Sequence, residues 1–336
     1  MRRRKSGARR WMKPAPSPPS TRSSARGCCP RAACGNTHRA NRSAPKATAT
    51  AACPFGDSPW KNMNASSEAP PLAIIPRALT LVEGTFLTRY KRFLADVRLA
   101  ATGEIVTAHC VNTGAMEGLT RPGGRVWLSL ADNPARKLHY TWELAEIDGR
   151  VFGVNTSMPN RIIGHLLRET RLPWHRRPWD EVRAEVRYGE RSRVDFRLAR
   201  GKRLHYLEVK NCHLIYPDDR AYFPDCISER ATGHLRELVQ VVQDGHTAEV
   251  IFCVQTPLVK SVRPSDVHDP AFALAARAAR EAGVRFHAIA VSHTPDSIII
   301  HRGVPVELKP YRTTRVFRWR DEAQAAAKQR LEDSKS

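Results

Sequence analysis

The sequence contains no Cys-x-x-Cys pair and no long apolar run, and it is short of acidic residues. Its eight cysteines are scattered, so we interpret them as reduced thiols of an intracellular protein and not as a disulfide framework. A stretch of about 18 apolar residues, which a membrane-spanning helix needs, is missing. The start of the chain also lacks the apolar segment of a secretory signal. These absences predict a cytoplasmic protein without a membrane partner.

The charge balance is strongly basic. Lysine and arginine number 55 against 33 aspartates and glutamates, which gives a formal net charge of +22. A basic folded body favours polyanions such as nucleic acid, because it attracts them and releases their counterions. The alternative is that the raised pI only reflects an Arg- and Ala-rich proteome.

Residues 1–71 are rich in Arg, Ser, Ala and Pro and have no apolar periodicity. Such a segment cannot bury enough surface to offset its ordering entropy, so we expect a disordered basic leader. Two interpretations stay open: a tail that binds nucleic acid, or an overextended translation start. Met63, just before the first patterned segment, favours the second.

Residues 72–155 show short runs of alternating apolar and polar residues, separated by turn signals. The clearest runs are 93–99, 105–110 and 126–130, and Asp148-Gly149 is typical of a tight hairpin. Five or six short strands in about 80 residues predict an OB-like barrel.

From residue 156 the pattern changes to that of a mixed α/β domain. Ile162, Ile163, Leu166 and Leu167 recur at helical spacing after Pro159. Three alternating strands follow, then a helix over 228–242, an apolar strand over 248–254, a helix over 270–282 and two more strands. The order α-β-β-β-α-β-α-β predicts a domain over 156–309. Residues 310–336 are predicted to form a charged, partly helical tail.

Three charged residues are predicted to converge on one strand hairpin of this domain. Glu208 and Lys210 are two residues apart on a strand, so their side chains share a face. The turn around Arg200-Gly201 places Asp195 opposite residues 206–208. The pattern Asp-x12-Glu-x-Lys in this order of elements is that of the PD-(D/E)xK restriction-endonuclease-like fold.

This arrangement suits metal-assisted chemistry on phosphodiesters. Asp195 and Glu208 would hold Mg²⁺ or Mn²⁺ through their oxygens, and the metal would activate a water and stabilise charge on the attacked phosphate. Lys210 would orient or deprotonate that water, or neutralise the phosphorane. We therefore predict all three as catalytic residues. The alternative is a solvated hairpin face with alternating charges, because the motif alone is weak.

The helix that follows the hairpin carries further candidates. Glu229 could add a metal ligand, and Arg230 or His234 could contact a phosphate. The alternative is that the acid only complements the helix dipole and that the other residues form a solvated face.

Many segments, in order along the chain, resemble the sugar fermentation stimulation protein A family: residues 81–84, 89–97, 109–116, 133–137, 140–144, 153–156, 192–196, 208–211, 223–225 and 229–238. The resemblance runs from about residue 81 to residue 306 and leaves out the leader and the tail. It implies an OB-like domain, a nuclease-like domain, DNA binding without strong sequence preference, and a link to the regulation of bacterial sugar metabolism. It also assigns Asp195, Glu208 and Lys210 to the nuclease-type motif. The sequence departs from the family at Ala231, where Gly is expected, and offers only Glu169 as an upstream helical acid.

Within the barrel, the run Arg89-Tyr90-Lys91-Arg92-Phe93 combines basic and aromatic residues. Such a run could pair phosphates with its cations and stack a base on Tyr90 or Phe93. The alternative is that Phe93 is core and the cations solvate the rim. The loops at 112–114 and 155–156 could face a groove between the domains. The predicted DNA-binding residues are Arg89, Tyr90, Lys91, Arg92, Arg193, Arg230 and His234.

Together these features predict a bacterial cytoplasmic DNA-binding protein of low sequence specificity. A divalent-metal-dependent nuclease remains the alternative.

Overall fold

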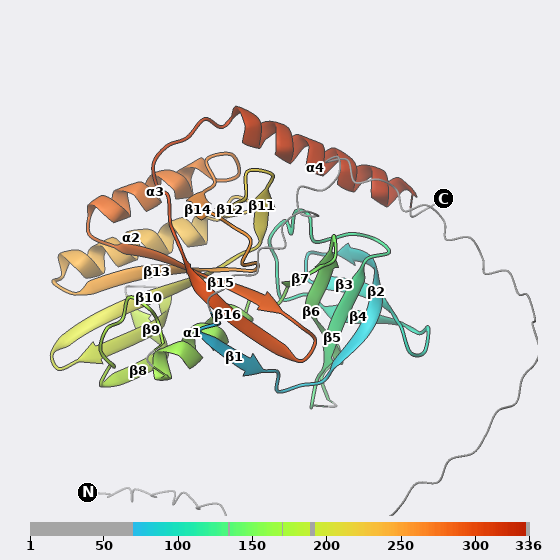
Figure 1. The fold of residues 1–336 in the computed structure, drawn as a ribbon, viewed down its shortest axis with the longest axis horizontal. Coiled ribbons are helices and arrows are strands. Elements are labelled where there is room, and N and C mark those ends of the chain that lie inside the picture. The colour runs from blue at the N-terminus through green and yellow to red at the C-terminus, as the bar shows by residue number, and fades with distance from the viewer. Residues whose placement is uncertain (1–69, 134, 170, 189–191, 334–336) are drawn as a thin grey trace, which may run out of the picture. The chain divides into compact units, whose positions relative to one another are not determined.

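The computed structural model describes residues 70–133, 135–169, 171–188 and 192–333. The predictions for residues 1–69 lie outside this part of the chain. A β-barrel is followed by a mixed α/β domain, as Figure 1 shows.

Five strands close into the barrel, in the order β4-β3-β2-β5-β6, and β4 pairs back onto β6 through Ala108 and Tyr140. The tight turn Asp148-Gly149 has positive φ at both residues, as a hairpin of this kind requires, and adds β7 beside β6. Phe86 stacks on Trp142 in the barrel core. The predicted OB-type barrel is therefore confirmed. Its strands are β2 (Leu81–Tyr90), β3 (Leu94–Leu99), β4 (Ile105–His109), β5 (Arg125–Leu130) and β6 (Tyr140–Ile147), followed by β7 (Arg150–Gly153).

The second domain is a seven-stranded sheet in the order β1-β16-β15-β13-β10-β9-β8. Its central strands β10, β13 and β15 are parallel, and the strands outside them are antiparallel. Helix α1 covers one face, and α2 and α3 cover the other, each over its own apolar core. The elements are α1 (Met158–Arg168), β8 (Glu181–Tyr188), β9 (Ser192–Arg200), β10 (Arg203–Cys212), α2 (Glu229–Gln243), β13 (Thr247–Val254), α3 (Pro270–Glu281), β15 (Arg285–His293) and β16 (Ser297–Val304). The predicted mixed α/β class is confirmed.

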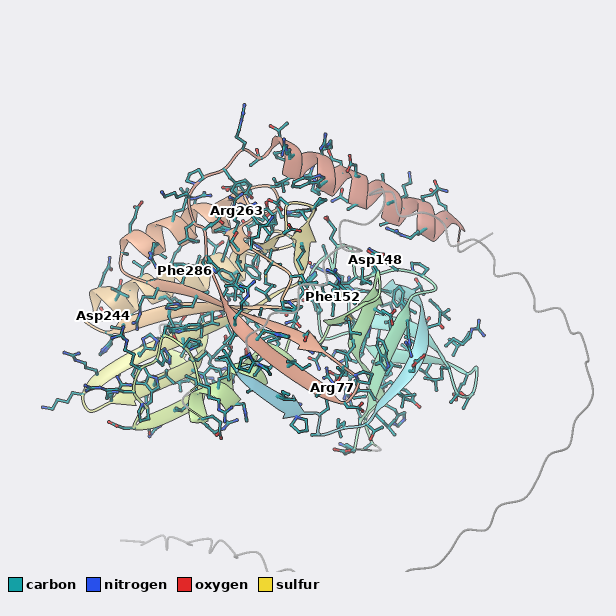
Figure 2. The ribbon with its side chains drawn as sticks, in the orientation of Figure 1. Arg77, Asp148, Phe152, Asp244, Arg263 and Phe286 are labelled. Atoms are coloured by element: carbon teal, nitrogen blue, oxygen red, sulfur yellow. The ribbon has the colours of Figure 1, made fainter. Side chains whose placement is uncertain are left out.

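The first strand of the described chain belongs to the α/β sheet and not to the barrel. We predicted residues 72–155 as one barrel, but β1 (Ala73–Pro76) pairs antiparallel with β16, with Ala73 opposite Ile300. Its apolar side chains pack into the core beneath α1, and this buried position explains why β1 joins the α/β sheet. Arg77, at the end of β1, donates to the carbonyl of Thr294 and contacts His293 at the end of β15 (Figure 2).

A small second sheet and a C-terminal helix complete the domain. Strands β11 (Leu214–Tyr216), β12 (Arg220–Phe223) and β14 (Ser261–Pro264) form this sheet, which the sequence analysis did not predict. Helix α4 (Thr314–Asp333) rests on it, because Trp319 stacks on Tyr216 at 5.9 Å between ring centroids. Within the described ranges, no helix combines the length and apolar character needed to cross a bilayer.

Candidate functional site

Asp195 lies where β9 parts from β10 and where one pair is missing from its ladder with β8. On the β8 side, Ala184 pairs with Phe196 and Val186 pairs with Val194, but the pair between these two is missing. Glu185, which would face Asp195 there, has a positive φ of 53°. On the other side, the β9–β10 register ends at Phe196–Leu207. Strand β9 therefore parts from β10 at Asp195, while its ladder with β8 resumes at Val194, and the Asp195 carboxylate reaches the backbone of β10.

That carboxylate is held by two donors. The Val209 amide donates to Asp195 Oδ2 and the Asn160 side chain, from the first turn of α1, donates to Oδ1, both at 2.7 Å. Burial first, and then the charge of Glu208, raise the pKa of Asp195 to about 6. A carboxyl with such a pKa is poised to exchange a proton for a cation near neutral pH.

Glu208 and Lys210 point to the opposite face of β10 from Leu207 and Val209, which pack under α1. Both charged side chains are buried, at 3% and 8% exposure. Lys210 Nζ donates to Glu208 Oε1 at 2.7 Å, and His234 Nδ1 from α2 contacts the same oxygen. Burial opposes ionisation of Glu208, but Lys210 and His234 outweigh it and hold its pKa below the ordinary value.

The second carboxylate oxygen of this residue has no partner. Glu208 Oε2 is buried without a hydrogen bond from any described residue. A buried, ionised oxygen of this kind is costly unless something compensates it. Asp195 and Glu208 thus supply the carboxylate oxygens that Mg²⁺, Mn²⁺ or Ca²⁺ prefer, and these residues could hold such an ion.

Two further side chains at this site were missed by the sequence analysis. Tyr188, near the end of β8, is buried, and burial together with the charges of Glu208 and Glu237 raises its pKa, so its hydroxyl stays a donor. Glu237 is three residues after His234 on α2, so helical periodicity could have placed both on one face. No sequence pattern pointed to Asn160 or to Tyr188.

The residues near the hairpin that were predicted to contact phosphate differ in their exposure to solvent. Arg193 and Arg230 are exposed, and Arg230 Nε lies 3.4 Å from His234 Nε2. His234 itself is buried and bound to Glu208, so it supports the acidic site from within. Glu229 and Glu169 are exposed at the start of α2 and just after the end of α1.

In the barrel, the predicted basic run forms the end of β2 and the turn after it. Arg89 donates to the backbone carbonyls of Arg92, Asn112 and Gly114, and Arg92 donates to that of Thr113. Both arginines therefore hold the loop at 112–114. The side chains of Tyr90, Lys91, Arg92 and Phe93 are exposed, and Phe93 is not a core residue.

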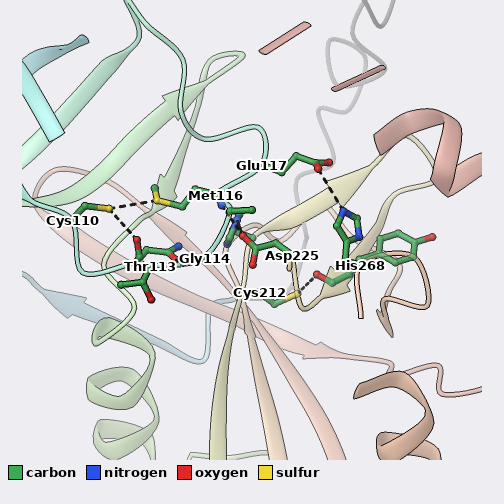
Figure 3. Close-up of polar contacts among 12 residues, drawn as sticks. Cys110, Thr113, Gly114, Met116, Glu117, Cys212, Asp225 and His268 are labelled. Carbon is green, nitrogen blue, oxygen red and sulfur yellow. Dashed lines mark hydrogen bonds and ion pairs between the residues drawn. The ribbon is translucent and has the colours of Figure 1, made fainter. Parts of the chain in front are cut away.

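The loop at 112–114 lies at the contact between the two domains (Figure 3). The Met116 amide donates to Asp225 Oδ2 at 2.7 Å, and a Cβ added to Gly114 would lie 2.8 Å from Asp225 Oδ1. Glu117 also pairs with His268 at 3.5 Å. Burial opposes ionisation of Asp225, but its contacts with His213 and the Met116 amide lower its pKa well below the ordinary value. This loop thus fastens the barrel to the α/β domain.

The second predicted groove loop, at 155–156, also has internal partners. Asn155 is buried, donates to Glu143 Oε2 and accepts the amide of Ser157 at the start of α1. Beside it, Gly153 packs so closely on Gln255 and His293 that a Cβ would collide with both.

Two family models match this architecture in succession. The SfsA N-terminal OB domain matches residues 87–154, and the sugar fermentation stimulation protein RE domain matches residues 157–297. The sugar fermentation stimulation protein homolog of Thioalkalivibrio sulfidiphilus is 43% identical over 229 residues, which cover 68% of this chain and 96% of the relative. The homolog of Geotalea daltonii is 42% identical over 228 residues, covering 68% and 97%.

A solved structure has the same fold. The structure of Pyrococcus furiosus SfsA in complex with Ca²⁺ is similar, with a TM-score of 0.63 and 26% sequence identity. The match covers 71% of this chain and all of that one.

Proposed function

This chain belongs to the sugar fermentation stimulation protein family, and on that premise we propose that it is a DNA-binding protein of low sequence specificity with a divalent-cation site at Asp195 and Glu208. The observation that carries the proposal is the parting of β9 from β10 at Asp195, whose carboxylate accepts the Val209 amide between the buried Glu208 and Lys210. This arrangement supports the nuclease-like domain that the sequence predicts. The family name supports a role for that binding in regulating sugar metabolism.

The cation would sit between the two carboxylates. Glu208 Oε2 accepts no hydrogen bond from the described part of the chain, and Asp195 exchanges its proton near neutral pH. The Ca²⁺ named for the Pyrococcus furiosus relative is an ion of the same oxygen-seeking kind. When bound, such an ion supplies positive charge to a phosphate oxygen. Lys210, held against Glu208, adds a second positive charge at the same place.

Exposed arginines next to the site suit a phosphate backbone. Arg193 on β9 is two residues before Asp195, and its Cα partner on β8 is Arg187. Both arginines are exposed. Arg230 extends the basic surface from the first turn of α2. Contacts of this kind fix a nucleic acid in place without reading its bases, which supports binding of low sequence specificity.

Binding is tested with the double variant Arg187→Ala/Arg193→Ala. Its affinity for duplex DNA should fall, and the slope of log K against log[salt] should become shallower by about two, because each phosphate contact contributes about one. Arg318→Ala on α4 is the matched control, since its side chain is 66% exposed and lies on another element. A double variant with the wild-type slope would contradict the proposed DNA surface.

Cleavage of DNA is the second candidate function. It is favoured by the presence of all three groups of a nuclease-type site, with Lys210 beside a carboxylate and Asp195 partly protonated near neutral pH. The test is incubation of DNA with Mn²⁺ and wild type, Asp195→Ala or Lys210→Ala. Cleavage by wild type alone would establish a phosphodiesterase. Binding by all three without cleavage would leave the DNA-binding function and remove the enzymatic one.

A further inference from the structure

A second cluster of ligating side chains lies on the other face of the sheet. His205, Glu249 and His287 stand on the neighbouring strands β10, β13 and β15. Each is two residues before an aliphatic member of the core under α1, so all three share that face. Those aliphatic residues are Leu207, Ile251 and Ile289. Glu208, by contrast, faces α2, so this cluster is separate from the acidic site.

His175 completes the cluster from the connection between α1 and β8. Its Nε2 lies 2.8 Å from Glu249 Oε1, and His205 Nε2 lies 3.3 Å from the same oxygen. His287 Nε2 lies 3.7 Å from Glu249 Oε2. His205 and Glu249 are fully buried, and His175 is 9% exposed. Within the described chain, the ligand atoms of His175, His205 and Glu249 all lie within 4.8 Å of one another.

The ring nitrogens of the three histidines lie at ion-pair distance from the Glu249 carboxylate. Nε2 of His175, His205 and His287 and both oxygens of Glu249 are buried without a partner of acceptable geometry among the described residues. Nε2 of His175 and Nε2 of His205 both face Glu249 Oε1, so three potential ligand atoms gather in one small volume. Five such atoms in one place are unusual, because buried polar atoms are nearly always paired.

We propose that His175, His205 and Glu249 bind a divalent transition-metal ion, Zn²⁺ above all, with His287 as the nearest further ligand. Imidazole and carboxylate donors suit Zn²⁺. A tetrahedral ion with bonds of about 2.0–2.1 Å keeps its ligand atoms about 3.3 Å apart. The distances from Glu249 Oε1 to His175 Nε2 and His205 Nε2, 2.8 Å and 3.3 Å, lie near that value. The ion would fasten the α1–β8 connection to the three central strands.

The surroundings of His205 suit a metal ligand. Its Nδ1 lies 2.8 Å from Thr247 Oγ1, whose own proton is directed to the carbonyl of Leu204. Arg285 Nη2 also lies 3.4 Å from this nitrogen, but the shorter contact with Thr247 favours donation from Nδ1, which leaves the lone pair of Nε2 free for a metal. Trp179 stacks on the His205 ring at 5.3 Å and fixes its plane.

His175 must change one contact to bind the ion. Trp179 Nε1 donates to His175 Nδ1 at 3.2 Å, which places the proton of a neutral ring on Nε2. Metal binding moves that proton to Nδ1, so the tryptophan N–H competes with the ion. Trp179→Phe keeps a stacking ring and removes the competing donor. If Glu249 were only paired with a protonated histidine, this change would leave metal affinity untouched.

The experiment is calorimetric titration of the metal-stripped full chain with Zn²⁺. We expect about one equivalent to bind in wild type and in Asp195→Asn/Glu208→Gln. Glu249→Gln should lose this binding, and Trp179→Phe should bind about tenfold more tightly. The visible spectrum of Co²⁺ in the same proteins reports nitrogen and oxygen ligation directly. His175→Gln, in a connecting segment, replaces Glu249→Gln if the latter does not fold, as judged by its thermal unfolding without metal.

Failure of wild type to bind Zn²⁺ would overturn the site. So would Zn²⁺ binding that survives Glu249→Gln and His175→Gln but disappears in Asp195→Asn/Glu208→Gln. The first result leaves the DNA-binding proposal untouched, and the second would place the Zn²⁺ at Asp195 and Glu208 instead, so the two proposals fail in different ways.

Discussion

At the scale of single residues, the sequence was enough to place Asp195, Glu208 and Lys210 on one strand hairpin. It did not predict which side chains surround them. Strand periodicity and turn position are enough to bring Asp195 near Glu208 and Lys210. The burial of Glu208 by α2, and the role of His234 as its partner, depend on tertiary packing that no local pattern encodes. His234 was predicted to touch DNA, and that contact stays a prediction for a residue that is buried.

The raised pKa of Asp195 makes stability depend on pH. Its folded value of about 6 exceeds the ordinary 3.8, so its contribution to stability is present below pH 3.8 and is lost as pH rises through about 6. In EDTA, we expect the free energy of unfolding of wild type to fall across that window by up to about 3 kcal/mol relative to Asp195→Asn. Urea denaturation at several pH values measures it. Equal pH profiles for the two proteins would refute the assignment, and Asp132→Asn, at an exposed position, is the matched control.

The buried Glu208–Lys210 pair should be sensitive to loss of one partner. Lys210→Met leaves the Glu208 carboxylate in a buried site with one cation fewer, so we expect a loss of about 3–5 kcal/mol in the free energy of unfolding. Adding Glu208→Gln removes the uncompensated charge and should recover most of that loss. Urea unfolding of the single and double variants gives the coupling, and additive effects would show that the two residues do not interact.

At the scale of elements, alternation and the Asp148-Gly149 turn made the barrel predictable. The position of β1 was not, because a short apolar strand does not indicate which sheet it joins. Strands β11, β12 and β14 escaped prediction because three or four residues are too few to show a period. The loop at 112–114 was predicted to face a groove between the domains, and residues 223–225 were noted only as a segment that carries the family resemblance. The structure gives them a physical role, since they hold barrel and α/β domain together.

Asp225 tests that junction. Asp225→Asn keeps the shape of the side chain but removes its negative charge. The hydrogen bond from the Met116 amide and the contact with His213 become weaker, so we expect the free energy of unfolding to fall by about 1–3 kcal/mol. Limited proteolysis between β7 and α1 should also become faster, because the two domains separate more readily. The exposed Asp132→Asn again serves as the control. Unchanged stability and proteolysis would show that the loop does not fasten the domains.

At the scale of the whole molecule, the excess of positive charge predicts a polyanionic partner, but it could not locate a surface for that partner. The net charge of +22 includes a leader outside the described residues. The structure indicates three exposed arginines as the candidate DNA contacts near Asp195 and Glu208. They are Arg187, Arg193 and Arg230. Binding would bring phosphates towards two carboxylates, which repel them unless a cation lies between.

The most direct test of the account is therefore the affinity for fluorescent duplex DNA with and without Ca²⁺, at constant ionic strength, for wild type and Asp195→Asn/Glu208→Gln. We expect Ca²⁺ to tighten binding by wild type about tenfold, because it replaces repulsion by attraction. The double variant should bind equally well in both conditions. DNA affinity of wild type that does not respond to Ca²⁺, or a response that survives in the double variant, would contradict a metal-dependent DNA site at Asp195 and Glu208.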